Sequence, residues 1–311
     1  MSTVASPVNV SSALEHFDHG INRVVVSADG RFVATSDVDM NLVVRRGNVE
    51  AFAGNFGSTS DKIRPTERVR GLAFSPNAEY LYVAAGDQVI ALHTDSWGTE
   101  WSYEAPRSFG FLIISPIALD VAANGDVAVA FDNGSIVVWD GHGVKKATIR
   151  DNDSPRWLHF VADGNKIVGT DSFSLCGWDI QNRKQKLKIR LAGRAFGLCV
   201  DRPGTVAATR TLQNIVLWDL IEKDIVSVIP VGPGIPVLAL HPHRKWLAFG
   251  ERNRVRIVDF AGAPVDTFDL DVTSALSLAF TPSGDELLVG CTEQNLVRLT
   301  LHHEADLEGL V

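Results

Sequence analysis

The chain has 311 residues, of which 45% are hydrophobic and 21% are charged, and its formal net charge is −8. This acidic balance excludes the broad positive field with which proteins bind nucleic acid or an anionic membrane surface, so we expect neither. The most apolar stretch, 109–119, is broken by Pro116 and is far shorter than the ~18 residues of a membrane-spanning helix, so no membrane insertion is expected. Three cysteines without paired spacing, and no basic residue before Arg23, favour a cytoplasmic protein without a signal peptide or a disulfide scaffold.

Residues 1–11 form a Ser- and Val-rich leader that we expect to be flexible. A short segment with alternating apolar residues, 13–17, precedes the first of several similar units. Each unit opens with an apolar-alternating run that ends in a tight turn, such as Ser27-Ala-Asp-Gly30 or Ser75-Pro-Asn-Ala78. The turns fall at positions 30, 78, 125, 164, 204, 244 and 284, which gives seven units with steps of 48, 47, 39, 40, 40 and 40 residues.

Two columns of residues are apolar in every unit. Six residues before the turn stand Val24, Leu72, Leu119, Leu158, Leu198, Leu238 and Leu278, and four residues before it stand Val26, Phe74, Val121, Phe160, Val200, Leu240 and Phe280. A separation of two residues is the period of a β-strand. A second apolar run follows each turn, as in a hairpin, because Asp, Asn and Gly tolerate the positive φ that hairpin turns need.

The third run of the unit contains a recurrent Trp-Asp pair. Trp139, Trp178 and Trp218 each lie 14 residues after their turn, and an Asp follows each of them. A fourth apolar run ends the unit, as at 145–149, 187–189 and 225–229. Four short strands in about 40 residues, repeated seven times, predict an all-β fold, a single seven-bladed β-propeller of four-stranded blades.

These residues resemble the WD-repeat family, over about residues 12–302 of the chain. The Trp-Asp pairs and the Ser-Pro-Asn and Thr-Pro-Ser-Gly turns are the basis of the resemblance. The chain departs from the family because no unit has Gly-His before its first strand, and because Asn133, Ser172 and Leu212 replace the family's turn Asp. We therefore expect a divergent propeller whose blades are held together mainly by apolar packing.

The last unit has only three runs, the third at 296–301, and residues 303–311 form an acidic tail. A propeller has to join its ends, because open sheet edges promote aggregation. Segment 13–17 lies about 15 residues before the turn at Gly30, as Ile149 lies 15 residues before Gly164. We therefore expect an N-terminal strand, 13–17, to pair with 296–301 and to complete the last blade of a propeller that extends over 12–302.

Two insertions, 55–68 and 97–115, lengthen the first two units by about eight and seven residues. The first is rich in Gly, Ser, Asp and Lys and is expected to be a solvated loop. The second contains Trp97, Trp101, Arg107, Phe109 and Phe111. Insertions on a rigid scaffold fall in loops and commonly bind partners, but these aromatic side chains can also pack onto the third blade, and both alternatives stay open.

No arrangement of residues typical of catalysis, metal binding or cofactor binding stands out. His302 and His303 lie beside acidic residues in the tail, where a metal site would lack supporting side chains. His241-Pro-His243 is expected to be a turn. Asp120 and His159 occupy a strand column that is otherwise small or apolar, so we expect a hydrogen-bonded structural role.

One rim of the propeller is the candidate partner-binding surface. The outer-to-inner connections and the middle turns lie on the face where the central channel opens, and this face receives Arg and Trp residues, which dominate the binding energy of many protein interfaces. The expected partner-binding residues are Arg107, Phe109, Phe111, Arg156, Trp157, Arg194, Arg210 and Arg252, and Arg70 and Arg254 share the rim. Acidic residues such as Asp132 and Glu251 also lie there and can neutralise the arginines.

The resemblance and the lack of catalytic residues favour a non-enzymatic scaffold that needs no cofactor and presents rim loops to partner proteins in a larger complex. The alternative is a propeller enzyme, similar to a lactonase or a dehydrogenase, with its site at the central channel. The channel columns offer no converging carboxylates or histidines, which disfavours this alternative. A stoichiometric Ca²⁺ or Zn²⁺ in the purified protein would favour it.

Overall fold

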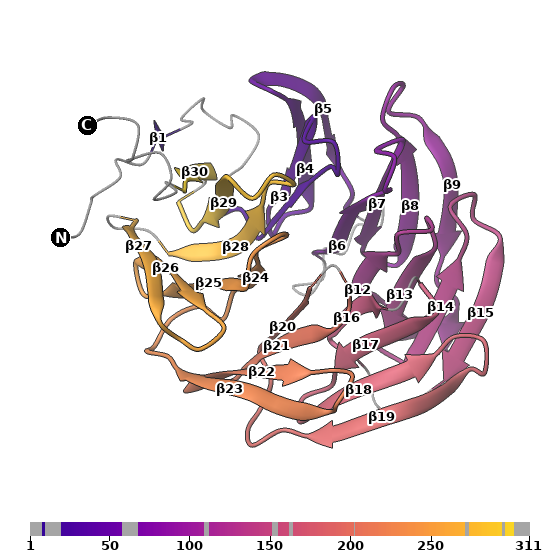
Figure 1. Ribbon diagram of the computed structural model, residues 1–311. Coiled ribbons are helices and arrows are strands. Elements are labelled where there is room, and N and C mark those ends of the chain that lie inside the picture. The colour runs from indigo at the N-terminus through magenta and orange to yellow at the C-terminus, as the bar shows by residue number, and fades with distance from the viewer. Residues whose placement is uncertain are drawn as a thin grey trace.

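The computed structural model describes residues 8–9, 20–57, 68–108, 112–150, 155–161, 164–201, 203–270, 274–293 and 296–301. Within these ranges the regular structure is 30 strands and no helix, and therefore includes no helix that could cross a membrane. Seven four-stranded antiparallel sheets stand in a ring, with one two-stranded sheet in addition (Figure 1). The predicted seven-bladed β-propeller is confirmed.

In the first six blades, four consecutive strands lead from the central channel outward. Blade 1 contains β2 (Arg23–Val26), β3 (Phe32–Ser36), β4 (Asn41–Arg46) and β5 (Val49–Asn55), and blade 2 contains β6 (Val69–Phe74), β7 (Tyr80–Ala85), β8 (Gln88–His93) and β9 (Thr99–Glu104). Blade 3 contains β12 (Pro116–Val121), β13 (Val127–Phe131), β14 (Ser135–Trp139) and β15 (Lys145–Arg150), and blade 4 contains β16 (Trp157–Val161), β17 (Lys166–Thr170), β18 (Ser174–Asp179) and β19 (Lys184–Arg190). Blade 5 contains β20 (Gly197–Val200), β21 (Val206–Arg210), β22 (Asn214–Asp219) and β23 (Asp224–Pro230), and blade 6 contains β24 (Leu238–Leu240), β25 (Trp246–Glu251), β26 (Arg254–Asp259) and β27 (Pro264–Asp269).

The last blade is completed by an N-terminal strand. Blade 7 contains β28 (Ala275–Phe280), β29 (Glu286–Cys291), β30 (Leu296–Thr300) and β1 (Val8–Asn9). Val8 pairs with Arg298 and Asn9 with Val297, so the expected mode of closure is confirmed.

The closing residues differ from those expected. The pairing strand lies inside the segment 1–11 that was expected to be a flexible leader, while 13–17 and the tail 303–311 lie outside the described residues. The prediction assumed a connection as short as those elsewhere in the ring. Residues 10–22 separate β1 from β2, whereas residues 191–196 separate β19 from β20, so counting back from the turn misplaced the strand.

The core consists of seven apolar clusters among the described residues, one between each pair of neighbouring blades. Between blades 3 and 4, for example, Ile136 and Ile149 pack with Leu158 and Trp178. Six clusters contain at least eight buried apolar residues. The seventh, between blades 7 and 1, consists of Ile21 and Val43 with Leu296 packed against them. Since apolar burial is the main stabilising term, the described residues of this seam contribute less apolar stabilisation than those of the other six interfaces.

At least one hydrogen bond crosses each of the seven interfaces. In ring order from the interface of blades 1 and 2, the bonds join the side chain of Arg23 to the carbonyl of Arg70, Trp101 to the carbonyl of Gly141, Asp120 to the N–H of Phe160, His159 to the carbonyl of Leu198, Arg210 to the carbonyl of Gly250, His241 to the carbonyl of Gly284, and Ser277 to the carbonyl of Ile21. Buried polar groups need such partners. The hydrogen-bonded role expected for Asp120 and His159 is therefore confirmed.

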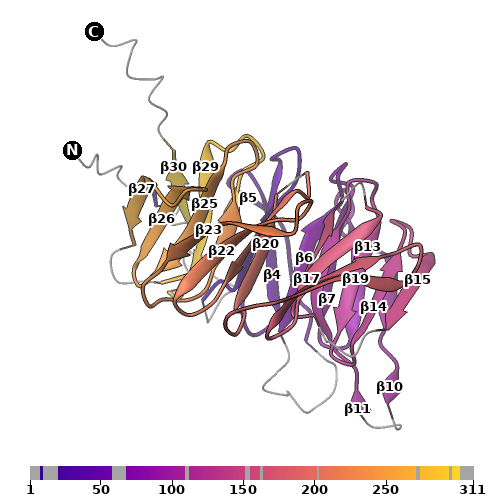
Figure 2. The same cartoon turned by 60° about the horizontal axis from the view of Figure 1, so that its bottom comes forward.

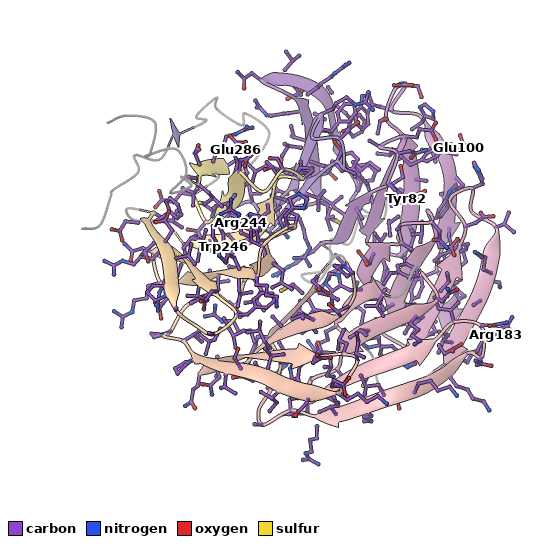
Figure 3. All side chains as sticks on the ribbon, viewed as in Figure 1. Tyr82, Glu100, Arg183, Arg244, Trp246 and Glu286 are labelled. Carbon is purple, nitrogen blue, oxygen red and sulfur yellow. The ribbon has the colours of Figure 1, made fainter. Side chains whose placement is uncertain are left out.

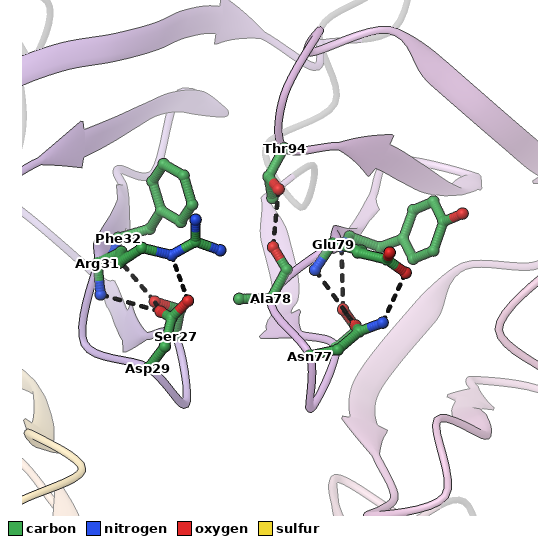
Figure 4. Close-up of polar contacts among 10 residues, drawn as sticks. Ser27, Asp29, Arg31, Phe32, Asn77, Ala78, Glu79 and Thr94 are labelled. Atoms are coloured by element: carbon green, nitrogen blue, oxygen red, sulfur yellow. Dashed lines mark hydrogen bonds and ion pairs between the residues drawn. The ribbon is translucent and has the colours of Figure 1, made fainter.

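The turns between the first and second strands of blades 1 and 2 share a hydrogen-bond pattern (Figure 4). In blade 1, the hydroxyl of Ser27 donates to Asp29 at 2.6 Å and accepts the N–H of Phe32 at 2.9 Å. In blade 2, the hydroxyl of Ser75 donates to Asn77 at 2.7 Å and accepts the N–H of Tyr80 at 2.9 Å. These side chains satisfy backbone groups that the tight turn would leave unpaired.

His241 occupies the same turn position in blade 6. Its Nδ1 accepts the N–H groups of His243 and Arg244 at 3.1 and 3.0 Å, and its Nε2 lies 3.1 Å from the carbonyl of Gly284. Both ring nitrogens are thus used within the protein. His241-Pro-His243 is a turn, as expected, and not a pair of metal ligands.

The three tryptophans of the Trp-Asp pairs are buried between blades. Trp139, Trp178 and Trp218 are 3%, 1% and 6% exposed, and in each case a β-bulge shifts the pairing of the third and fourth strands just before the tryptophan. The indole N–H of Trp218 donates to the hydroxyl of Thr209 at 2.8 Å. Apolar burial supported by an occasional polar contact is what the divergent sequence predicted.

Replacing Trp178 by Ala should lower the free energy of unfolding by about 3–5 kcal/mol, because a large, fully buried side chain is lost from the contact of blades 3 and 4. Phe173→Ala in the same blade is the control, because Phe173 is 54% exposed and its loss should change stability by less than about 0.5 kcal/mol. Urea denaturation followed by circular dichroism measures both. Equal effects of the two substitutions would show that the tryptophan does not hold the blades together.

Candidate functional site

Three arginines stand where inner strands begin. Arg23 is the first residue of β2, Arg70 the second residue of β6, and Arg156 directly precedes β16. All three line one cavity of about 830 Å³ at the mouth of the central channel. The inner strands of blades 1, 2 and 4 converge on the ring axis, and they thereby bring together cations that lie far apart in the sequence.

The arginines of this mouth are partly buried and repel one another. Burial, followed by the charges of Arg70 and Arg68, lowers the pKa of Arg23. Burial also lowers the pKa of Arg70, with Arg68 and Arg156 adding to the effect and Asp132 opposing it. Arginine remains charged in proteins despite such shifts. The mouth therefore concentrates positive charge on an acidic protein.

Asp132 is the one carboxylate among the described lining residues. Its Oδ1 accepts the backbone N–H of Ser115 at 3.1 Å, which fixes it beside the start of β12. Burial raises its pKa, although this hydrogen bond and the charge of Arg70 oppose the shift. A single carboxylate whose ionisation is opposed by burial cannot neutralise three lining arginines.

The opposite side of the mouth is apolar. Blades 5 to 7 contribute Phe196, Pro236, Val237 and Leu276, which we call the apolar arc, as distinct from the cationic arc of Arg23, Arg70 and Arg156. Aromatic and aliphatic side chains on one side and guanidinium groups on the other suit a ligand with an anionic group next to an apolar group.

A histidine–carboxylate pair lies deeper, on the inner strands of blades 3 and 4. His159 Nδ1 lies 3.7 Å from Asp120 Oδ2, and its Nε2 lies 3.3 Å from the carbonyl of Leu198 in blade 5. Burial opposes protonation of His159, but the hydrogen bond and charge of Asp120 outweigh it, with a smaller contribution from Leu198, so that the pKa is raised. A general base needs a ring nitrogen that reaches substrate, whereas both nitrogens here face protein groups. The pair ties three blades together.

The second insertion divides into two parts. Trp97 stacks on Phe52 with ring centroids 5.3 Å apart, and Trp101 donates its indole N–H to the carbonyl of Gly141 at 3.0 Å, so both pack onto neighbouring blades. The rest forms a hairpin of β10 (Arg107–Ser108) and β11 (Leu112–Ile113), which extends away from the ring (Figure 2). Phe109 and Phe111 lie outside the described residues, between these strands.

The other predicted rim residues are distributed unevenly. Arg156 and Trp157 line the mouth. Arg194 is exposed, and its guanidinium lies 5.5 Å from the ring centroid of Phe196 in the apolar arc. Arg252 is exposed in the turn between β25 and β26 and is not among the described lining residues, and its backbone N–H donates to the carbonyl of Pro233 at 3.1 Å. The structure therefore places Arg156 and Trp157 in the mouth and Arg194 beside it, while Arg252 does not belong to the described lining.

Arg210 was expected to lie on the rim surface, but the structure shows that it is buried. It is 1% exposed, its Nη1 donates to the carbonyl of Gly250 at 2.8 Å, and its guanidinium lies 5.8 Å from the ring centroid of Phe249. The neighbouring blade covers it because it ends β21, where the two blades are in close contact. Arg210 is a structural link between blades 5 and 6, so replacing it by Glu would report on folding and not on binding.

Arg23 was missed as a candidate in the sequence. It lies on the inner strand, whereas the predicted binding residues are those of connections and turns. A usable signal was present, since Arg23 occupies the column of Trp157, directly before the apolar column of Val24 and Leu158.

The described residues form no candidate metal site, and their cysteines are buried. No group of three or more His, Cys, Asp or Glu side chains among them is placed to hold a metal ion, and His302 and His303 lie outside the described part. Cys176, Cys199 and Cys291 are buried free thiols, and burial raises the pKa of Cys199 to about 12. A protonated, buried thiol is a poor nucleophile.

No family model matches the chain. Among solved structures, the one titled "Structure of U3-55K" superimposes with a TM-score of 0.77 at 14% identity, covering 92% of this chain and 96% of that one. The "Crystal structure of RRP9 WD40 repeats" gives a TM-score of 0.78 at 14% identity with the same coverage. At this identity the similarity concerns the fold, and it confirms the predicted likeness to WD-repeat propellers.

The stabilising effect of the Asp120–His159 pair should depend on pH. Because the pKa of folded His159 is raised, the pair contributes fully below the unfolded value of about 6.5, and the contribution is lost as the pH rises through the folded pKa. The isosteric substitution Asp120→Asn should therefore cost more stability near about pH 5.5 than near about pH 8.5, by up to about 1 kcal/mol. Urea denaturation at the two pH values measures this difference. The same loss of stability at both pH values would mean that a protonated His159 does not form an ion pair with Asp120.

Proposed function

We propose that this protein is a non-enzymatic scaffold within a larger complex, and that it binds a partner protein with the face on which the central channel opens. The main support is the divided mouth on that face, where the cationic arc stands opposite the apolar arc. Arg194 extends the mouth beside Phe196, and the β10–β11 hairpin extends from the ring. Arginine and aromatic residues around a concave centre are typical of protein interfaces.

The chemistry of the described residues favours binding over catalysis. Asp132 is the one carboxylate lining the mouth, and both nitrogens of His159 face protein atoms. Catalysis by general acid and base needs titratable groups that reach a bound substrate. The net charge of −8 favours a protein partner over nucleic acid, and three buried free cysteines are compatible with the cytoplasm.

Replacing Phe109 and Phe111 by Ser tests the hairpin as an apolar anchor. The tagged full chain is used to capture partner proteins from an extract of its native cells, and mass spectrometry measures how much of each partner is recovered. We expect the recovery to fall about tenfold, because buried aromatic anchors dominate the dissociation rate. Arg156→Glu combined with Arg194→Glu should weaken recovery more at low salt than at high salt, since exposed charges are screened.

Arg183→Glu is the matched control, because Arg183 lies in the turn between β18 and β19, on the opposite face of the ring, and is exposed. All variants should keep the circular dichroism spectrum and melting temperature of the parent. If the Phe109 and Phe111 variant unfolds, these side chains belong to the core. If all variants fold and keep every partner, binding takes place on another surface.

A further inference from the structure

The cationic arc has the composition of an anion-binding site. Arg23, Arg70 and Arg156 line one cavity of about 830 Å³, and Arg68 adds its charge to that of Arg23 and Arg70. Within the described lining, only Asp132 opposes them. Like charges that share a partly desolvated cavity repel one another, so a bound anion would remove an electrostatic cost that the fold otherwise maintains.

Two of these arginines have N–H donors that no residue in the described part of the chain accepts. Arg23 Nη2 donates to the carbonyl of Arg70 at 3.1 Å and Nη1 to the carbonyl of Asn22 at 3.3 Å, which fixes its guanidinium but uses two of five N–H donors. The side chain of Arg156 makes no hydrogen bond or ion pair with the residues that the structure describes. Both residues line the cavity, and hydrogen bonds hold the guanidinium of Arg23 in place.

We propose that this mouth binds a phosphorylated side chain in an extended segment of a partner protein, with a neighbouring apolar side chain of that segment lying against Phe196 and Pro236. A phosphomonoester carries a charge of about −1.5 to −2 at neutral pH and three acceptor oxygens. Its charge and number of acceptors therefore suit several guanidinium groups better than those of a single carboxylate ligand. Arginine binds phosphate oxygens with paired N–H donors. The inference rests on the proposed function, because the segment belongs to the partner that this face binds.

The surroundings of the mouth favour a protein segment over a nucleic acid. Nucleic acid brings a continuous row of phosphates, which the net charge of −8 repels outside the mouth. One phosphate on an otherwise neutral segment avoids this repulsion. The apolar arc also includes Pro236, Val237 and Leu276, which suit an aliphatic or aromatic side chain.

The test uses the purified full chain and three fluorescent degenerate peptide libraries, centred on phosphoserine, glutamate or serine, each with an apolar residue next to the centre. Fluorescence anisotropy should show binding of the phosphoserine library at least about tenfold tighter than of the glutamate library. Arg156→Gln and Arg23→Gln should each weaken this binding about tenfold, and inorganic phosphate should compete with it. Arg183→Gln, on the outer part of blade 4 (Figure 3), makes the same change of charge away from the mouth and should have no effect.

Equal binding of the three libraries would overturn the proposal, as would an unchanged affinity of the folded Arg156→Gln variant. Tighter binding of a single-stranded RNA oligonucleotide than of the phosphoserine library would also overturn it. Should Arg23→Gln fail to fold, Arg156→Gln and phosphate competition still decide the question. Partners that depend on Phe109 and Phe111 but bind equally well after Arg156→Gln would leave the scaffold function intact and contradict only this site.

Discussion

Apolar contact between the facing sheets of neighbouring blades holds this ring together. Successive residues of one strand point alternately toward the two neighbouring blades. In β13, Val127 and Val129 pack toward blade 2, while Ala128 and Ala130 pack toward blade 4. Among the residues that the structure describes, the seam between blades 7 and 1 has the smallest apolar cluster, built on Ile21 and Val43. Strand β1 and the hydrogen bonds of Ile21 with neighbouring residues of blade 7 add a second kind of link at this seam.

The same ring geometry determines what the channel mouth contains. Because the inner strands stand side by side around the channel and begin on the same face, the residues at their starts form a circle whatever their separation in sequence. Blades 1, 2 and 4 place arginine in this circle, and blades 5 to 7 place apolar residues there. The rigid inter-blade contacts keep these like charges together, which a flexible loop would not do. Stability of the ring and chemistry of the mouth are thus linked.

The period of the sequence was sufficient to predict the number of blades, the strand columns and the burial of Trp178. It could not identify side-chain partners in adjacent blades, because a repeat defines positions within a unit and not contacts between units. Arg210 was therefore taken for a surface residue, although it donates a hydrogen bond to the carbonyl of Gly250 in blade 6. Arg23 was overlooked for a different reason, because it lies on an inner strand and the predicted binding residues were those of connections and turns. The prediction that an N-terminal strand closes the ring was correct, but its residues were wrong, because the connection after β1 does not follow the repeat.

Thermal unfolding of N-terminally shortened chains tests most directly whether β1 closes the ring. A chain lacking residues 1–9 loses the pairing of Val8 with Arg298 and of Asn9 with Val297, whereas a chain lacking residues 1–6 keeps both pairs. We predict that the shorter deletion leaves the melting temperature unchanged and that the longer one lowers it by at least about 2–4 °C, which corresponds to the loss of about 1 kcal/mol. Equal melting temperatures for the two shortened chains would contradict closure by β1.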